Sequence, residues 1–522
     1  MVSKHIFSST TRTVPTADTK NRAGGKAYKF AADHALAQYA ATGCFGGIFY
    51  ASAAEQIEWV LDAAAHVDDE FLAKTAIYAR ERGQMKDVPA LLVALLAARG
   101  AAELDVAFER VIDNGRMLRN FVQIVRSGVT GRRSFGSRVK RLITRWLDAR
   151  SDAAVFRASV GNDPSLADII KMVHPAPRSA SRRALYGYLL GKAHDPSALP
   201  KLVTDFEHFK THGGKEVPDV PFQLLTILEL TTRQWAHVAR HAGWQMTRMN
   251  LNTFVRHHVF DDPAVGPEMV ELVAKRLADP EAIASARAFP YQLMVAWQAA
   301  STQLPPEIRD ALGDAMEIAV ANVPRIEGNV YVLPDVSGSM HSPVTGFRKG
   351  STTAVRCIDV AALVAAAFMR RNRRTVVLPF HDRVESCSLD RRDSIMTNAT
   401  TLARLPSGGT DCAEPLRELN RRHAKGNLVV FVSDNQSWID TTRRWNPGTN
   451  VMEQWEQYKR RNPKAKLVCI DVQPYATSQA PDRADILNVG GFSDAVFDVI
   501  AAFVADTLTP GHWAGEIAAM KL

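Results

Sequence analysis

Residues 330–339 read VYVLPDVSGS, an apolar run followed directly by one acidic and two hydroxyl side chains. A buried strand that ends in this way presents a carboxylate and two hydroxyls from a tight loop. A threonine and a second aspartate far along the chain complete a set of hard oxygen ligands without His or Cys, which suits Mg²⁺, Mn²⁺ or Ca²⁺ rather than zinc. We therefore predict a divalent-cation site, with Mg²⁺ as the expected ion. Its expected ligands are Asp335, Ser337, Ser339, Thr410 and Asp434.

The surrounding sequence decides between this site and a simpler interpretation. An isolated Asp-x-Ser-x-Ser occurs by chance, and such an Asp more often caps a helix. Here a helix-like segment at 352–370 follows, and strand-like runs recur at 375–380, 427–432 and 467–471. Strands that alternate with helices predict a doubly wound parallel sheet, where ligands bind at the carboxyl ends of strands. Asp335 and Asp434 both lie at such ends, so the context favours the metal site.

Composition and charge limit the class of protein. At 522 residues the chain is expected to form two or more domains, and its net charge of +9 with a pI near 9.3 indicates a polyanionic partner. Five scattered cysteines without a Cys-x-x-Cys pair disfavour a disulfide framework or a zinc site. The N-terminus lacks the apolar core of a signal peptide, and the most apolar run, 90–98, is too short to span a bilayer. We expect a cytoplasmic protein without a membrane partner.

The first half of the chain has a helical period. From about Ala51 to Val323 nearly every segment fits it, with short breakers such as 161–164 and 305–306. No strict repeat emerges, which disfavours tetratricopeptide and ankyrin arrays but suits an irregular solenoid of the HEAT type. The predicted domains are an N-terminal arm at 1–25, an all-α HEAT-like solenoid at 26–323 and a doubly wound α/β domain at 324–522.

The strongest local concentration of positive charge lies between Arg116 and Arg150, a stretch that contains ten basic residues and a single acidic one, Asp148. An apolar stripe at helical spacing runs through this stretch, and Arg138, Arg141 and Arg145 fall on another face. These arginines either pair with acids on neighbouring helices or bind phosphates. The near absence of local acids favours phosphates, because arginine forks match phosphate geometry. The basic residues predicted to bind RNA are Arg132, Arg133, Arg138, Lys140, Arg141 and Arg145. Further along the chain, Arg182, Arg183, Lys192 and Lys201 are expected to extend the patch.

Two resemblances follow from these motifs. Asp335, Ser337 and Ser339, with Thr410 and Asp434, are similar to the metal-ion-dependent adhesion site of von Willebrand factor A domains. Nearly the whole chain resembles the Ro ribonucleoprotein family, bacterial members included, whose helical module is called TROVE. The segments that carry this second resemblance are 131–132, 168–175, 286–296, 335–340, 406–412 and 491–500.

The Ro resemblance implies a function. In that family the helical repeats form a ring closed by the von Willebrand factor A domain, single-stranded 3′ ends of misfolded noncoding RNAs enter the hole, and small Y RNAs bind outside. It implies an RNA-binding scaffold for RNA quality control, monomeric and not an enzyme, with an exoribonuclease partner bridged by RNA. His174 matches a family histidine at the Y RNA surface and Arg157 a basic position there. The turn Gly161-Asn162 lacks a basic residue that some relatives have, so the Y RNA contacts at this turn are expected to differ from theirs.

Other functions remain open from the residues alone. His174 before Pro175 is, from the residues alone, more often an ordinary helix end than a ligand-facing residue. The metal site could instead serve a metal-dependent protein-adhesion scaffold, with RNA binding incidental. A metal hydrolase is disfavoured, because His341, Asp411 and Glu414 near the expected ligands show no catalytic spacing.

Overall fold

The structure is a computed structural model of the chain. It describes residues 14–286, 288, 290–320, 323–347, 355–438, 447–491, 493, 495–508 and 512–522, so much of the predicted N-terminal arm lies outside it. The chain divides into two compact units. The first, the sheet unit, combines residues up to His66 with Val320–Ala519, and the second, the helical unit, combines Val67–Ala319 with the last three residues.

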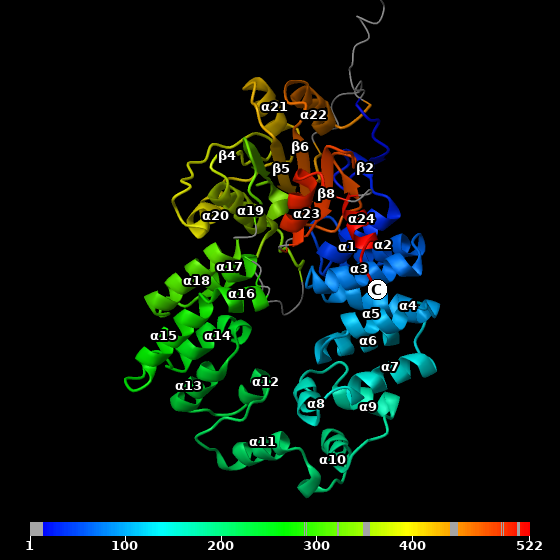
Figure 1. The fold of residues 1–522 in the computed structure, drawn as a ribbon, viewed down its shortest axis with the longest axis vertical. Coiled ribbons are helices and arrows are strands. Elements are labelled where there is room, and N and C mark those ends of the chain that lie inside the picture. Colours follow the sequence, from blue (N-terminus) through cyan, green and yellow to red (C-terminus); the bar gives the residue numbers. More distant parts are fainter. Residues whose placement is uncertain are drawn as a thin grey trace, which may run out of the picture. The chain divides into compact units, whose positions relative to one another are not determined.

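A five-stranded parallel sheet forms the centre of the sheet unit (Figure 1). Its first strand along the chain, β3, is fully buried, as the apolar run predicts. The crossover order confirms the predicted doubly wound α/β fold. In spatial order the strands are β4 (Thr375–Val377), β3 (Val330–Pro334), β5 (Leu428–Ser433), β6 (Lys466–Asp471) and β8 (Ile486–Gly490).

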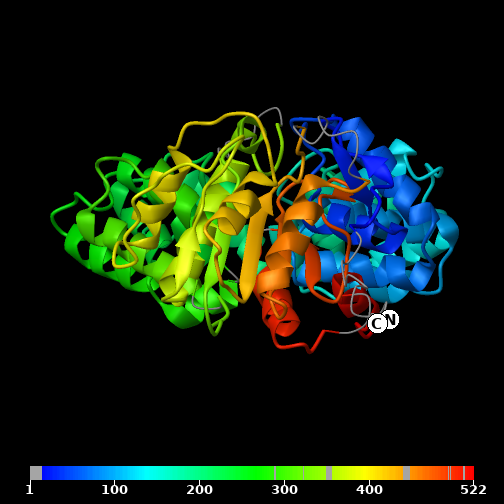
Figure 2. The same cartoon turned by 90° about the horizontal axis from the view of Figure 1, so that it is seen from above.

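Helices cover both faces of this sheet. On one face, α21 (Glu414–Arg421) and α22 (Asn450–Arg461) bury Trp455 against Tyr331 and Phe431. Because alternate strand residues point to opposite faces, the neighbouring strand residues face α19 (Cys357–Arg371) and α23 (Ala495–Val504). The helix α20 (Ile395–Ala403) packs on α19. Figure 2 shows the strands between these helical layers.

The N-terminal segment also belongs to the sheet unit. Strand β2 (Lys26–Lys29) pairs with β1 (Thr19–Lys20) and with β7 (Thr477–Ser478). The helix α1 (Ala32–Thr42) packs against β8, α2 (Ala53–Ala65) and α24 (His512–Ala518), and nine of its eleven residues are buried. The Nδ1 atom of His34 in α1 lies 2.8 Å from the Asp482 carboxylate. These contacts bind the start of the chain to the end of the sheet.

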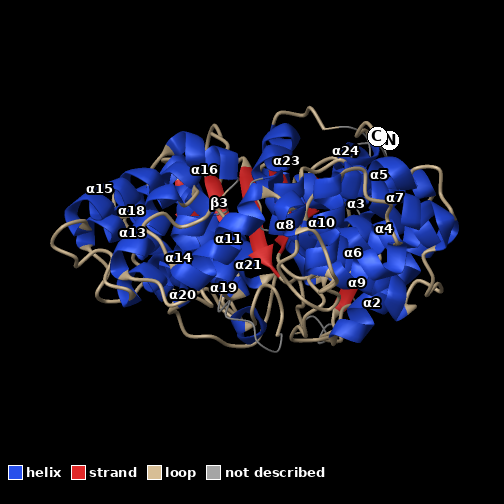
Figure 3. Cartoon of the chain, turned by 90° about the horizontal axis from the view of Figure 1, so that it is seen from below, coloured by secondary structure: helices blue, strands red, loops and turns tan. Residues whose placement is uncertain are grey.

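The helical unit confirms the all-helical expectation for Val67–Ala319, and its described residues contain no strand (Figure 3). Strand β2, which falls inside the predicted all-α range 26–323, belongs to the sheet unit instead. Helices close in sequence pack on one another, such as α3 with α4 and α5, and α15 with α18. Nothing in the described part of the chain is a helix long and apolar enough to cross a membrane. The helices are α3 (Asp69–Glu81), α4 (Asp87–Arg99), α5 (Leu104–Val111), α6 (Gly115–Ser127), α7 (Gly136–Asp148), α8 (Asp152–Ala158), α9 (Leu166–Val173), α10 (Ala180–Leu189), α11 (Lys201–His212), α12 (Phe222–Leu225), α13 (Thr232–His241), α14 (Trp244–Arg256), α15 (Gly266–Leu277), α16 (Pro280–Ala286), α17 (Pro290–Ala299) and α18 (Pro306–Ala319).

Local signals in the sequence set where these helices begin and end. The Asn114 side chain accepts a hydrogen bond from the N–H of Met117 and begins α6, and Gly128 ends it in the left-handed conformation with φ of 81°. Along α4 ten residues are buried, which matches its nearly unbroken apolar sequence. The helical unit therefore has its own core, and closure of a ring stays a prediction.

Candidate metal centre and basic surface

Three aspartates lie at the carboxyl ends of adjacent strands. Asp335 follows β3, Asp434 follows β5, and Asp471 is the last residue of β6. Parallel pairing brings these strand ends to one edge of the sheet, and the N–H of Asp335 donates to the carbonyl of Val432 at 3.0 Å. The sheet register therefore gathers carboxyl groups that are far apart in the sequence.

Hydrogen bonds fold the loops around this edge. The N–H of Ser337 donates to Asp335 Oδ1 at 2.8 Å, and the short turn Gly338–His341 follows. The N–H of Gly338 donates to the carbonyl of Gly408 at 3.1 Å, and the Ser437 hydroxyl to that of Thr410 at 3.3 Å. The loop that carries Thr410 is thus held between the other two loops. All five expected ligands are buried, at 5% exposure or less: Asp335, Ser337, Ser339, Thr410 and Asp434.

Burial opposes ionisation of the two central aspartates. It raises the pKa of Asp335, although Ser337 and the Ser433 hydroxyl, 2.6 Å away, stabilise the carboxylate. Burial and then the charge of Asp335 raise the pKa of Asp434 to about 7, against a stabilising hydrogen bond from Ser339. Two buried carboxylates that repel each other are the arrangement that a cation would relieve.

The residues present fit a hard divalent cation. Within the described residues no Lys or Arg side chain forms an ion pair with Asp335 or Asp434. The same residues contain no group of three or more His, Cys, Asp and Glu in metal-binding geometry, so a cation here would depend on hydroxyls beside two carboxylates. Oxygen-only donors of this kind suit Mg²⁺, Mn²⁺ or Ca²⁺.

Sequence reasoning missed several neighbours of this edge. Asp471 is buried, its Oδ1 has no hydrogen-bond partner within the described residues, and burial followed by the charge of Asp434 raises its pKa well above the usual value. Its position at a strand end, like that of Asp335, was the available signal. Tyr50 comes from the N-terminal segment: burial and then the charge of Asp434 raise its pKa to about 12, although Ser339 hydrogen-bonds to it.

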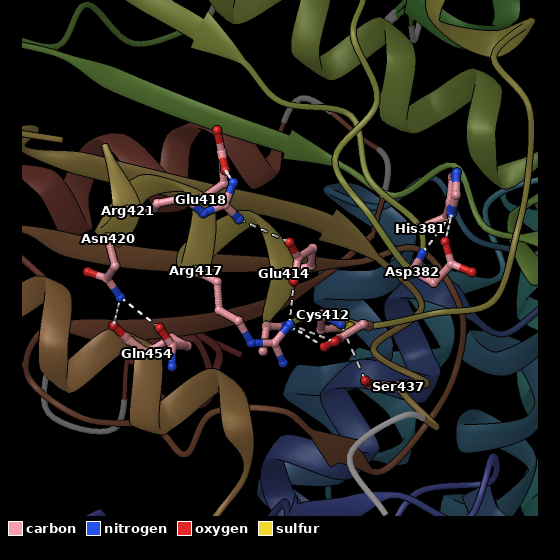
Figure 4. Close-up of polar contacts among 12 residues, drawn as sticks. His381, Asp382, Cys412, Glu414, Arg417, Glu418, Asn420, Arg421, Ser437 and Gln454 are labelled. Atoms are coloured by element: carbon pink, nitrogen blue, oxygen red, sulfur yellow. Dashed lines mark hydrogen bonds and ion pairs between the residues drawn. The ribbon is translucent and has the colours of Figure 1, made fainter. Parts of the chain in front are cut away.

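His381 contacts the loop that carries Thr410. Its carbonyl accepts a hydrogen bond from the N–H of Asp411 at 2.9 Å. Its ring lies 2.6 Å from Asp382 (Figure 4) and 2.8 Å from Glu385. The ring is only 4% exposed. We infer that His381 positions the loop that carries Thr410.

The basic stretch folds as predicted on its apolar side. Helix α7 buries a stripe whose spacing follows the helical period. Trp146 anchors it, because its indole N–H donates to the carbonyl of Ile112 at 2.6 Å. The buried residues of this stripe are Val139, Leu142, Ile143, Trp146 and Leu147.

The expectation that Arg138 and Arg145 face solvent without acidic partners is wrong. Both pair with Asp105 of α5, at 2.8 and 3.0 Å, and Arg145 also lies 3.2 Å from Glu109. Arg138 further donates to the carbonyl of Ala101 at 2.8 Å, just past the end of α4. Local sequence could not show this, because the acids precede the arginines by more than thirty residues. Although burial disfavours its charge, the two arginines lower the pKa of Asp105.

Other basic residues of α7 remain available. Lys140 and Arg141 are exposed, and the described residues form no ion pair or hydrogen bond with their side chains. Arg133 is exposed as well, whereas Arg132 donates to the carbonyls of Ala97 and Ser134 at 3.2 and 2.9 Å. The free cations of this surface are therefore fewer than the sequence indicates.

The remaining predicted contacts differ in accessibility. Arg157 is 2.6 Å from Asp219 at the surface. His174 is exposed and ends α9 in the left-handed conformation with φ of 52°, as the helix-end alternative expects. Arg182 is only 7% exposed and bonds to Asp152 and to the carbonyl of Leu147, at 2.5 and 2.9 Å. Arg182 is therefore a structural residue and does not extend the patch.

A cavity of about 550 Å³ opens beside this surface. Phe108, Leu142 and Trp146 line its apolar part, and Arg150 lies over the Trp146 ring at 3.5 Å. Arg178, which pairs with Asp148 at 2.7 Å, lines its polar part. The lining of the cavity thus combines aromatic side chains with guanidinium groups.

The sheet and its strand-end aspartates define an α/β domain of the von Willebrand factor A class, here combined with a helical unit. Residues 330–504 match the family model described as the Ro60 vWA domain. Over 517 residues the chain is 26% identical to the RNA-binding protein RO60 of Deinococcus radiodurans, covering 93% of this chain and 94% of that one. Over nearly its whole length the chain is therefore similar to Ro60 proteins, and its residues 330–504 match the Ro60 vWA domain.

Two further comparisons agree with this family. The RNA-binding protein RO60 of Caenorhabditis elegans is 24% identical over 255 residues, which cover 46% of this chain and 38% of that one. The crystal structure of the Deinococcus radiodurans RO (RSR) protein is similar with a TM-score of 0.60 at 20% identity, covering 91% of this chain and all of that one. This structural likeness supports the fold.

Proposed function

We propose that this protein is an RNA-binding scaffold rather than an enzyme. The observation that carries the proposal is the similarity over 93% of the chain to a protein named for RNA binding. The exposed Lys140 and Arg141 on α7, held in place by the buried side of the helix, supply cations for the phosphate backbone.

The proposed ligands are small structured Y-like RNAs and the single-stranded 3′ ends of misfolded noncoding RNAs. His174 and Arg157 lie on exposed parts of the helical unit, where an RNA could reach them. An exoribonuclease bridged by RNA and a cytoplasmic role in RNA quality control belong to the same proposal.

We further propose that Asp335 and Asp434, with the hydroxyls of the loops around them, hold a divalent cation, most simply Mg²⁺. When bound, the ion would neutralise the repelling carboxylates and attract an acidic partner group. The chain's own part is to keep these oxygens buried and to hold the three loops together through the bonds of Gly338 and Ser437. This edge also supports the alternative of a metal-dependent protein-adhesion scaffold.

Salt-dependent binding tests the RNA proposal. The probe is a labelled RNA hairpin with a single-stranded 3′ tail, titrated with the full chain between 50 and 200 mM salt. We expect the double variant Lys140→Gln/Arg141→Gln to lower the slope of log affinity against log salt by about 1.4, near 0.7 for each lost contact on a single strand. Arg138 and Arg145 are left intact, because their removal would unpair Asp105.

A matched control removes two exposed cations elsewhere in the helical unit. Arg256→Gln/Lys275→Gln carries the same charge change and should leave the slope unchanged. Absence of RNA binding by the unaltered chain would refute the proposed function. Equal slopes for both double variants would remove α7 from the interface.

A further inference from the structure

The edge of the sheet opposite the strand-end aspartates receives three turns from helices. Helices α19, α21 and α22 lead into strands β4, β5 and β6, which start at this edge. The segments read RRNRR at 370–374, RRHAKG at 421–426 and KRRNPKAK at 459–466. Each turn therefore delivers several basic side chains to the same edge.

Strand register places these turns in one row. Val330 is opposite both Thr375 and Leu428, and Leu428 is opposite Lys466. The N–H of Val330 donates to the carbonyl of Arg374 at 3.1 Å, and the N–H of Lys466 to that of Asn427 at 2.9 Å. Because neighbouring strands are about 4.8 Å apart, the row from β4 to β6 spans about 14 Å.

Asparagine side chains hold the turns against one another. The Asn329 amide donates to the carbonyl of Lys425 at 2.7 Å, and the Asn462 amide to that of Ala424 at 3.1 Å. The N–H of Gly426 in turn donates to Asn462 at 3.2 Å. The cations are therefore carried on a fixed backbone.

Six exposed cations of this edge, which we call the basic edge, form neither an ion pair nor a side-chain hydrogen bond within the described residues, whereas Arg371 donates to the carbonyl of Val323. Their neighbours behave differently: Arg421 pairs with Glu418 (Figure 4), Arg422 pairs with the same carboxylate, and Lys466 lies 2.5 Å from Asp506. Counting the exposed Glu327 of the same row, six cations less one acid leave a charge of about +5. The basic edge consists of Arg325, Arg373, Arg374, Lys425, Arg460 and Lys464.

Helix dipoles do not account for these charges. A cation in the last turn of a helix is stabilised by the terminal carbonyls, and this explains Arg460 in α22. Arg373 and Arg374 lie beyond the end of α19, Lys425 beyond α21 and Lys464 beyond α22. Their clustering at one edge therefore needs another explanation.

We propose that the basic edge is a second RNA-binding surface, which grips the phosphate backbone on the sheet unit. A nucleic-acid strand carries a charge about every 3.4 Å, so a row of about 14 Å can face roughly four phosphates. The row is built from charged and asparagine side chains, whereas a protein interface normally has an apolar centre. The chemistry therefore favours a polyphosphate over an acidic protein. This inference rests on the proposed RNA-binding function and extends it to a second surface.

The full chain, probed with the same tailed hairpin RNA, tests the proposal. We expect Arg373→Gln/Arg374→Gln to lower the salt slope by about 1.4 and to weaken binding about tenfold at 100 mM salt. The matched control Lys29→Gln/Arg404→Gln removes two exposed cations of the same unit that form no ion pair within the described residues and lie outside the basic edge, and it should change neither quantity. In a second measurement, bound RNA should protect Lys425 and Lys464 from acetylation.

The outcomes separate this inference from the proposed function. If the unaltered chain binds no RNA, both fail. The second surface alone is overturned by a different pattern. In that pattern the unaltered chain binds RNA and Lys140→Gln/Arg141→Gln weakens binding, but the basic-edge variant binds like its control and RNA does not protect Lys425. Protection of Lys425 and Lys464 by polyglutamate but not by RNA would also overturn it and would identify an acidic protein partner instead.

Discussion

At the scale of single residues, the surroundings of the strand-end aspartates disfavour the ionised form of their carboxyl groups. Asp335 and Asp434 are 0% and 2% exposed, and each disfavours the charge of the other. Ser337, Ser339 and Ser433 offset only part of this cost through hydrogen bonds. A bound cation would relieve the remaining cost, and the proposed metal binding therefore has a pH dependence of definite direction.

We predict that stabilisation by Mg²⁺ grows as pH rises. The pKa of Asp434 near 7 lies above its unfolded value, so without metal this group's contribution to stability is full below about pH 4 and is lost as pH rises through 7. Metal binding must displace that proton, and proton competition therefore weakens it at low pH. Thermal unfolding with and without 5 mM Mg²⁺ should show a small shift at about pH 5.5 and a larger one at about pH 8.

Substitution at the same position provides the control. In Asp434→Asn the repulsion is removed, so the metal-free protein should be at least as stable as the unaltered chain at pH 8, and the Mg²⁺ shift should disappear. A shift in Asp434→Asn as large as that of the unaltered chain would contradict the assignment of Asp434 as a ligand.

At the scale of elements, α7 shows what a helical period determines and what it does not. The period identifies the buried stripe around Trp146, because one face of a helix must meet its neighbours. It cannot identify the partners of Arg138 and Arg145, because Asp105 belongs to α5 and approaches only after the helices pack. Charge patterns along one helix therefore overestimate the free cations of a packed array.

Arg182 of α10 gives the clearest test of such packing. Its guanidinium joins Asp152 of α8 to the carbonyls of Leu147 and Arg150 at the end of α7. We predict that Arg182→Ala lowers the free energy of unfolding by about 3 kcal/mol, because it leaves a carboxylate and two carbonyls without their donor.

The adjacent arginine is the matched control for this effect. Arg183 is exposed, so Arg183→Ala should change the free energy of unfolding by less than about 0.5 kcal/mol. Urea unfolding of both variants measures the difference. Equal effects of the two substitutions would show that the network around Arg182 does not stabilise the three helices.

At the scale of the whole molecule, features that local sequence signals specify were predictable, and features that depend on contacts between residues far apart in the sequence were not. The strand-end positions of Asp335 and Asp434, the parallel sheet and the all-helical stretch were predictable, because strand ends and hydrophobic periods are local signals. The membership of residues 14–66 in the sheet unit was not, since it depends on contacts with residues more than 400 positions away. Asp471 was missed for a related reason: its partner edge exists only once β6 pairs with β5.

The last prediction concerns that N-terminal segment. Leu36 of α1 is fully buried where α1 packs on β8 and α24. Leu36→Ala should lower the free energy of unfolding by about 2–5 kcal/mol, because it leaves a cavity. Hydrogen exchange should then accelerate in β5 and β6 of the same unit, whereas Lys29→Ala, at an exposed position of β2, should leave exchange unchanged. Unaltered protection of β5 and β6 from hydrogen exchange in Leu36→Ala would mean that the sheet folds independently of residues 14–66, and that these residues pack against it without stabilising it.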